Sequence, residues 1–158
     1  MTPSQNLLLR LVRAGLVTGV TDGLFSSALA AFVYGSTVAR LWQGVASMLL
    51  GAAAFDGGAR SVAIGLAMHF GVAVAWSAVF LVLVISSSWL RDVLASPYGV
   101  ITVASVYGPL IWLVMSLAII PMLTHRPPAI NIRWWVQFFG HIPAVALPIV
   151  ALISGSHP

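Results

Sequence analysis

The sequence predicts an all-α integral membrane protein: a four-transmembrane-helix bundle plus one short amphipathic or re-entrant helix. Hydrophobic residues make up 60% of the 158 residues and charged residues only 6%, whereas about a quarter of a typical soluble domain is charged. The stretch 61–87 carries no formal charge and would form roughly 40 Å of helix, enough to cross a bilayer with some tilt. The chain length fits a single transmembrane domain spanning residues 1–158.

The first helix is expected over residues 6–35. Its interior repeats small residues at every fourth position, beginning with Gly15, Gly19 and Gly23, and such a row predicts a face for close helix packing. Asp22 flanks this face and should therefore point into the bundle. A carboxylate at this depth is costly unless it is protonated or has a partner, so Asp22 is either a polar packing contact or a functional acid.

Residues 38–55 are expected to form the short helix at the membrane interface. Arg40, Gln43 and Ser47 make a polar stripe, and only the part from 41 to 55 is apolar enough to enter lipid. That length gives about 22 Å of helix, which favours an interfacial or re-entrant position. A crossing helix would instead give a clearer arginine bias between the two sides, so the membrane orientation stays open.

The second full span, 61–87, contains two rows of small residues. Ala67 and Gly71 belong to a row that predicts a packing face, while His69 lies on the nearly opposite row between Gly65 and Ala73. The third span is expected over 97–123.

The last span, 134–154, carries Gln137 and His141 one turn apart on one face. Pro143 and Pro148 follow, so this helix must bend. The carbonyls that lose their backbone donors then need partners within the protein.

His69 and His141 form the most suggestive pair of residues. Their helices are separated by one full span and so run in the same direction, and each histidine is expected at a similar depth. Three interpretations follow: hydrogen bonding between helices, binding of a tetrapyrrole (haem b or chlorin), or a proton relay with Asp22.

Several other classes of function are disfavoured. The seven basic residues are all arginines and are scattered singly, so nucleic-acid binding is not expected. The chain has no cysteine, and no set of three clustered histidines and carboxylates predicts a metal site. Neither a nucleophile elbow nor a glycine-rich phosphate loop is present, so the chain is not expected to be an enzyme.

Three segments, 41–70, 96–122 and 140–150, resemble a family of uncharacterised bacterial inner-membrane proteins with about four predicted transmembrane helices. The pair Thr21-Asp22, the histidine at position 69 and the His141 that precedes Ile142-Pro143 match its pattern. The resemblance implies a multi-pass protein of the bacterial inner (cytoplasmic) membrane. It also marks Asp22, Gln43, His69 and His141 as residues to test.

The function expected first is that of a packing or accessory subunit in a homo-oligomer or a larger membrane complex, because of the glycine and alanine rows. Its partners would be the lipid bilayer and either further copies of the chain or other membrane subunits. The alternatives are electron transfer through a tetrapyrrole held by His69 and His141, and proton- or ion-coupled transport that uses Asp22.

Overall fold

The computed structural model describes residues 3–155, and this part of the chain is helical with no strand. The ends of the predicted domain, residues 1–2 and 156–158, lie outside the described residues. The elements in chain order are α1 (Pro3–Ala28), a π-helical turn (Leu29–Val33), α2 (Val38–Leu50), a 3-10 turn (Gly51–Phe55), α3 (Gly58–Ser86), α4 (Ser88–Leu94), α5 (Gly99–Val114), a π turn (Met115–Ile119), α6 (Ile120–Thr124), α7 (Ile132–His141), a π turn (Ile142–Ala146) and α8 (Leu147–Ser154).

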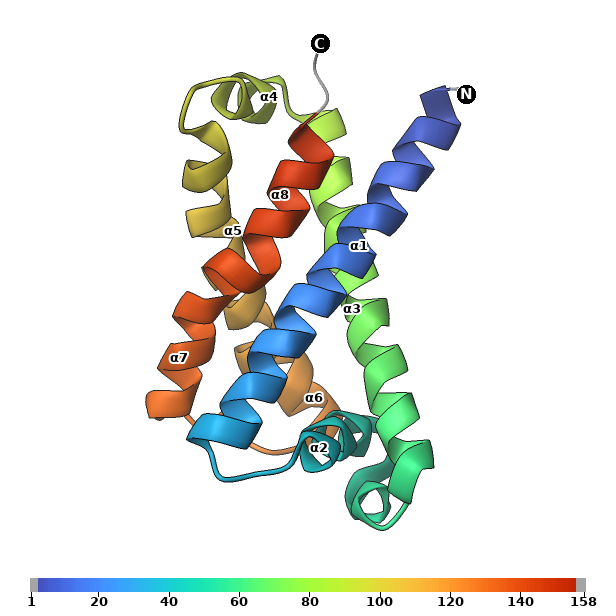
Figure 1. The fold of residues 1–158 in the computed structure, drawn as a ribbon. Coiled ribbons are helices and arrows are strands. Elements are labelled where there is room, and N and C mark those ends of the chain that lie inside the picture. Colours follow the sequence, from blue (N-terminus) through green and yellow to red (C-terminus); the bar gives the residue numbers. More distant parts are fainter. Residues whose placement is uncertain (1–2, 156–158) are drawn as a thin grey trace.

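The described residues contain five helical stretches long and apolar enough to cross a membrane: 6–33, 38–55, 58–86, 99–124 and 132–154. Their bounds differ by only a few residues from those expected from the sequence. The stretch 38–55 also qualifies, so length and composition alone do not separate four spans from five. In Figure 1 this stretch begins and ends at the same end of the bundle, where α1 ends and α3 begins.

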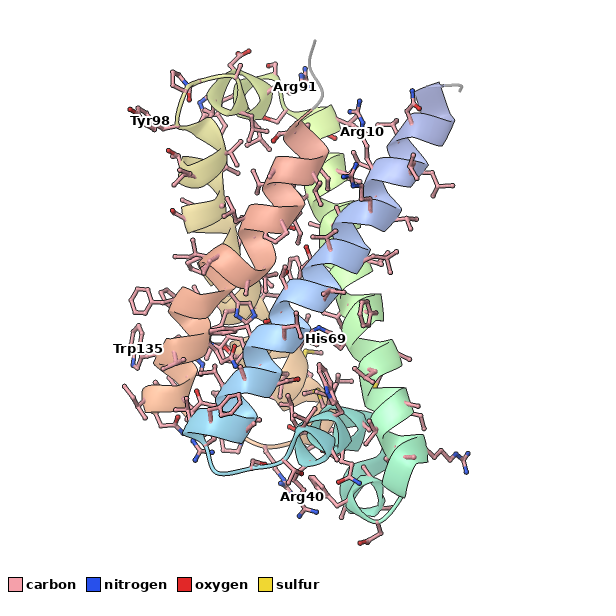
Figure 2. All side chains as sticks on the ribbon, viewed as in Figure 1. Arg10, Arg40, His69, Arg91, Tyr98 and Trp135 are labelled. Carbon is pink, nitrogen blue, oxygen red and sulfur yellow. The ribbon has the colours of Figure 1, made fainter. Side chains whose placement is uncertain are left out.

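The outer surface of the bundle is strongly apolar. Leu24 is 67% exposed, Phe32 88% and Ile132 77%. Such large exposed apolar side chains would be unfavourable in water, whereas hydrocarbon accommodates them. The arginines lie toward the two ends: Figure 2 shows Arg10 and Arg91 at one end and Arg40 at the other. The fold and its surface are therefore consistent with a multi-pass membrane protein.

Local signals in the sequence explain where helices begin and end. The Thr37 hydroxyl accepts a hydrogen bond from the Arg40 backbone N–H at 3.1 Å and caps α2. Gly58 has a φ of 52°, a conformation that glycine adopts readily, at the sharp turn into α3. At the other end of α3, the Arg91 guanidinium donates to the carbonyls of Val84 and Ile85 at 2.8 and 2.9 Å. These bonds satisfy carbonyls that the helix end leaves without donors.

The apolar core lies between α3, α5 and α8, in the half of the bundle near α4. Its fully buried members include Phe80, Ile111 and Ile149. One polar contact crosses this region: the Tyr107 hydroxyl donates to the Trp76 carbonyl at 2.8 Å. Satisfying a buried hydroxyl in this way avoids a desolvation cost of about 1–3 kcal/mol.

The last helix shows how proline changes the bonding of its neighbours. In a regular α-helix the N–H of residue 148 would donate to the Ala144 carbonyl, but Pro148 has no N–H. The Thr21 hydroxyl of α1 donates to that carbonyl instead, at 2.6 Å. A freed carbonyl thus has a partner within the protein, as the sequence led us to expect.

Candidate functional site

Asp22 of α1 and His69 of α3 face each other in the interior of the bundle. The Nδ1 atom of His69 lies 3.9 Å from the Oδ2 atom of Asp22, and both side chains are about one-seventh exposed, at 14% and 16%. Figure 2 shows His69 between the two ends of the bundle, away from the arginines at those ends. These two residues are called the Asp22–His69 pair below.

Close packing of α1 against α3 brings the pair together. A side chain at Gly15 would meet Val74, its Cβ lying 2.5 Å from the Val74 Cγ2 atom, and one at Gly19 would overlap the Phe70 ring. The two helix backbones therefore approach closely at these glycines. The Gly19 carbonyl can then accept a hydrogen bond from the Nε2 atom of His69, at 2.9 Å.

Aromatic rings from two helices hold the His69 ring. Trp42 of α2 makes an edge-on contact with a distance of 5.0 Å between ring centroids, and Phe70 makes another at 5.7 Å. Trp42 can reach His69 because α2 packs closely on α3 at Gly65, where an added Cβ would overlap the Trp42 carbonyl. A Cβ at Gly23 would make ordinary van der Waals contact with both rings, at 3.5 Å. Helix α2 therefore covers His69 from one side.

The hydrogen bond to Gly19 fixes which nitrogen of His69 carries a proton. A carbonyl oxygen only accepts, so Nε2 must donate and carry the hydrogen. In the neutral ring, Nδ1 then presents a lone pair toward the Asp22 carboxylate. Two acceptors that face each other at 3.9 Å repel unless a proton lies on one of them. The geometry is therefore suited to holding one proton at the Asp22–His69 pair.

Polar atoms without partners extend this region. The Thr18 hydroxyl, one turn before Asp22, is buried and has no hydrogen-bond partner among the described residues, and the same is true of the Oδ1 atom of Asp22. Neither Thr18 nor Ser26 makes a side-chain hydrogen bond to Asp22 among the described residues. Asp22 thus retains a free acceptor next to His69.

His141 follows Gly140, where an added Cβ would overlap the ring of Phe25 on α1, three residues after Asp22. The Nδ1 atom of His141 bonds to the Gln137 carbonyl at 2.7 Å, and its ring packs on Trp112 with a distance of 4.9 Å between centroids. The structure therefore places the three titratable residues singled out in the sequence in one region of the bundle.

The small residues of α3 divide into a buried row and an exposed row. Gly65, Ala73 and Ser77 are buried toward α1 and α2, on the same side as His69. Ala67 and Gly71 are exposed, and no atom would lie within 4 Å of a Cβ at Gly71. Within this chain, the packing face of α3 is therefore the row that contains His69, and the row of Ala67 and Gly71 faces outward.

Two polar residues predicted from the sequence lie outside the pair. Gln43 is buried on α2, at 9% exposure, and Gln137 on α7 lines a cavity at the end of the bundle near α2. Sequence analysis did not find this cavity, because its walls come from Tyr34, Trp112 and the loop 125–131, which are far apart in the chain.

The tetrapyrrole interpretation can be compared with the histidine environments. The Nε2 atom of His69 donates a hydrogen bond to the Gly19 carbonyl. The rings of Trp42 and Phe70 contact the imidazole. Neither His69 nor His141 lines the three main cavities of the described residues. Tetrapyrrole binding by His69 and His141 therefore stays a prediction.

Residues 3–155 also hold no group of three or more histidine, cysteine, aspartate or glutamate side chains placed to bind a metal ion. The fold and the site together define a helical membrane-type bundle with an interior carboxylate–imidazole pair. No family model, curated protein or solved structure matches the chain.

Proposed function

We propose that the protein is a multi-pass protein of the bacterial inner membrane that moves protons, alone or coupled to another ion or solute, through the Asp22–His69 pair. The observation that carries this proposal is the 3.9 Å approach of the two titratable side chains in the interior of an apolar bundle. Ionisable groups at such depth are expensive and are a functional-site hypothesis by default. In this topology four helices cross the membrane and α2 lies at the interface, covering the pair.

The chemistry follows from the available atoms. Asp22 keeps one unpartnered oxygen, and His69 keeps its Nδ1 position for a second proton. At 3.9 Å the two acceptors are too far apart for a hydrogen bond, so a proton would pass between them after a small side-chain movement or through one water molecule. His141, on the helix that packs on α1 near Phe25, would be the next group in such a relay.

Replacing Asp22 with asparagine tests this proposal. Asparagine keeps the size of the side chain but cannot take up a proton, so proton flux should fall by roughly tenfold or more. The measurement uses purified protein in liposomes that contain a pH-sensitive dye, with a membrane potential as driving force. Asp56→Asn is the matched control, because Asp56 lies exposed in the turn before α3.

The proposal fails if wild-type vesicles acidify no faster than empty ones. It also fails if Asp22→Asn and Asp56→Asn both leave the flux unchanged.

A second candidate function is that of a packing or accessory subunit, as expected from the sequence. It is supported by the outward face of α3, where Ala63, Ala67, Gly71 and Ala75 are all exposed at spacings of four. Small residues in lipid allow a second helix to approach closely. We propose that this face, defined by those four residues, packs against another copy of the chain.

Cross-linking tests the second candidate without background, since the chain has no native cysteine. An Ala67→Cys variant should form a disulfide-linked dimer in membranes under mild oxidation. A Leu24→Cys variant, on the exposed surface of α1, should stay monomeric. Equal cross-linking of the two variants would indicate random collision, and no cross-linking at Ala67→Cys would exclude this face as a contact between copies.

A further inference from the structure

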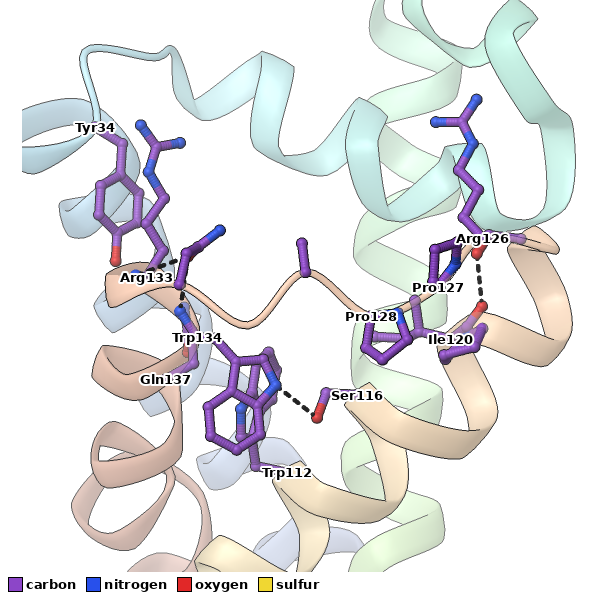
Figure 3. A pocket seen from close by; sticks show the side chains of 14 residues that line it. Tyr34, Trp112, Ser116, Ile120, Arg126, Pro127, Pro128, Arg133, Trp134 and Gln137 are labelled. Carbon is purple, nitrogen blue, oxygen red and sulfur yellow. Dashed lines mark hydrogen bonds between the residues drawn. The ribbon is translucent and has the colours of Figure 1, made fainter.

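A cavity of about 430 Å³ lies at the end of the bundle near α2. Its walls come from α5, α6, α7, the loop 125–131 and Tyr34, as Figure 3 shows. The volume is in the range of small-molecule sites. It is separate from the Asp22–His69 pair, because neither of those residues lines it.

The charge in this cavity is entirely positive. Arg126 and Arg133 both line it, and no aspartate or glutamate does. The Arg133 guanidinium lies over the Tyr34 ring, 4.4 Å from its centroid, which holds the cation at the cavity wall. Guanidinium groups without carboxylate partners favour binding of a phosphate or carboxylate anion.

Two donors at the wall have no partner. The Tyr34 hydroxyl and the Trp112 Nε1 atom are buried and make no hydrogen bond among the described residues. The neighbouring Trp134 differs, because its Nε1 atom donates to the Ser116 hydroxyl at 3.0 Å. A buried donor left unpaired costs free energy, so each of these two groups would be stabilised by an acceptor that reached it.

Apolar side chains make up about half of the lining, beside the uncharged polar residues Ser116, Thr124, Asn131 and Gln137. Ile120, Pro127 and Pro128 line the cavity together with the rings of Trp112 and Trp134. Trp134 and the 46%-exposed Trp135 are typical of the interface between lipid tails and headgroups. A ligand in this cavity would contact an arginine with its charged group and the apolar side chains with its hydrocarbon part.

We propose that the cavity binds a phosphate ester attached to a hydrocarbon tail. The phosphate would face Arg133, which lies beside Tyr34, while Arg126 lies at the other end of the cavity (Figure 3). The Tyr34 hydroxyl would donate to the phosphate once the ligand displaces the side chains that cover it. The tail would lie on the apolar wall. An anionic phospholipid and a soluble alkyl phosphate share this chemistry.

The test is a binding titration followed by native mass spectrometry on the full chain in mild detergent. The probes are phosphatidylglycerol, hexyl phosphate and inorganic phosphate. Arg133→Gln should raise the Kd for the tailed phosphates roughly tenfold, and Tyr34→Phe by a few-fold. Arg60→Gln is the matched control: Arg60 is exposed near the same end, at the start of α3, and does not line the cavity.

Tyr34→Phe also separates binding from folding. It removes only an unpartnered hydroxyl, so the melting temperature without ligand should not fall. Preference for phosphatidylglycerol would identify a lipid site, and preference for hexyl phosphate with the same variant pattern would identify a soluble phosphate ester. Equal binding of inorganic phosphate, equal weakening by Arg60→Gln, or no saturable binding would each overturn the proposal.

Discussion

Replacing Gly65 with alanine should destabilise the protein by about 1–3 kcal/mol, the usual cost of overpacking a tight interface. The added Cβ would overlap the Trp42 carbonyl oxygen and lie 2.8 Å from the carbonyl carbon. These are backbone atoms of α2, so no rotamer change can relieve the clash. The two helices must separate instead, and Trp42 then loses its contact with His69.

Gly71→Ala is the control for this prediction. Gly71 lies on the same helix, and a Cβ there meets no atom within 4 Å. Alanine also has a higher helix propensity than glycine, so stability should be unchanged or slightly raised. Thermal unfolding of the two variants in the same detergent, followed by circular dichroism, gives the comparison. Equal melting temperatures would mean that α2 does not pack on α3 at Gly65.

Replacing His69 with leucine should cost about 1–3 kcal/mol, the usual cost of leaving a buried polar group without its hydrogen bond. Leucine cannot bond the Gly19 carbonyl and leaves Asp22 without its partner. Asp22→Asn in the His69→Leu background should recover part of the loss, because the uncompensated carboxylate is then gone.

A double-mutant cycle isolates the interaction free energy between Asp22 and His69 from their interactions with other residues. The unfolding free energies of wild type, His69→Leu, Asp22→Asn and the double variant give the coupling between the two side chains. We expect a coupling of about 1 kcal/mol or more. If the two losses simply add, the residues do not interact, and the relay proposed for the Asp22–His69 pair loses its basis. Leu24→Ala, at an exposed position of α1, serves as the unrelated control.

Much of the fold could be predicted from the sequence because long apolar runs and their polar interruptions set the helix bounds. The inward position of Asp22 was also predictable, since Gly15 and Gly19 mark the face of α1 that packs. The sequence could not show which of the two rows of small residues on α3, that of Gly65 and Ala73 or that of Ala67 and Gly71, packs within the chain. Both rows allow close approach, and only the docking of Trp42 on Gly65 selects the row of His69.

The cavity near α2 could not be predicted because it depends on long-range placement. Tyr34, Arg126 and Arg133 have no spacing in the sequence that relates them, and Trp112 comes from a different helix. Their meeting requires the loop 125–131 to run from α6 across to the start of α7 (Figure 3). The pattern of apolar and polar residues along a helix does not show which distant segments come into contact.

The wide turn over Ile142–Ala146 constrains how the last helix can change during evolution. The buried positions His141, Val145, Ile149 and Ile153 recur every four residues, and in a regular α-helix each step of four advances about 40° beyond a full turn. The wide turn offsets part of this advance. Deleting one residue there would rotate all that follows by about 100° and turn Ile149 and Ile153 away from the core. Insertions and deletions in this segment should therefore not be tolerated.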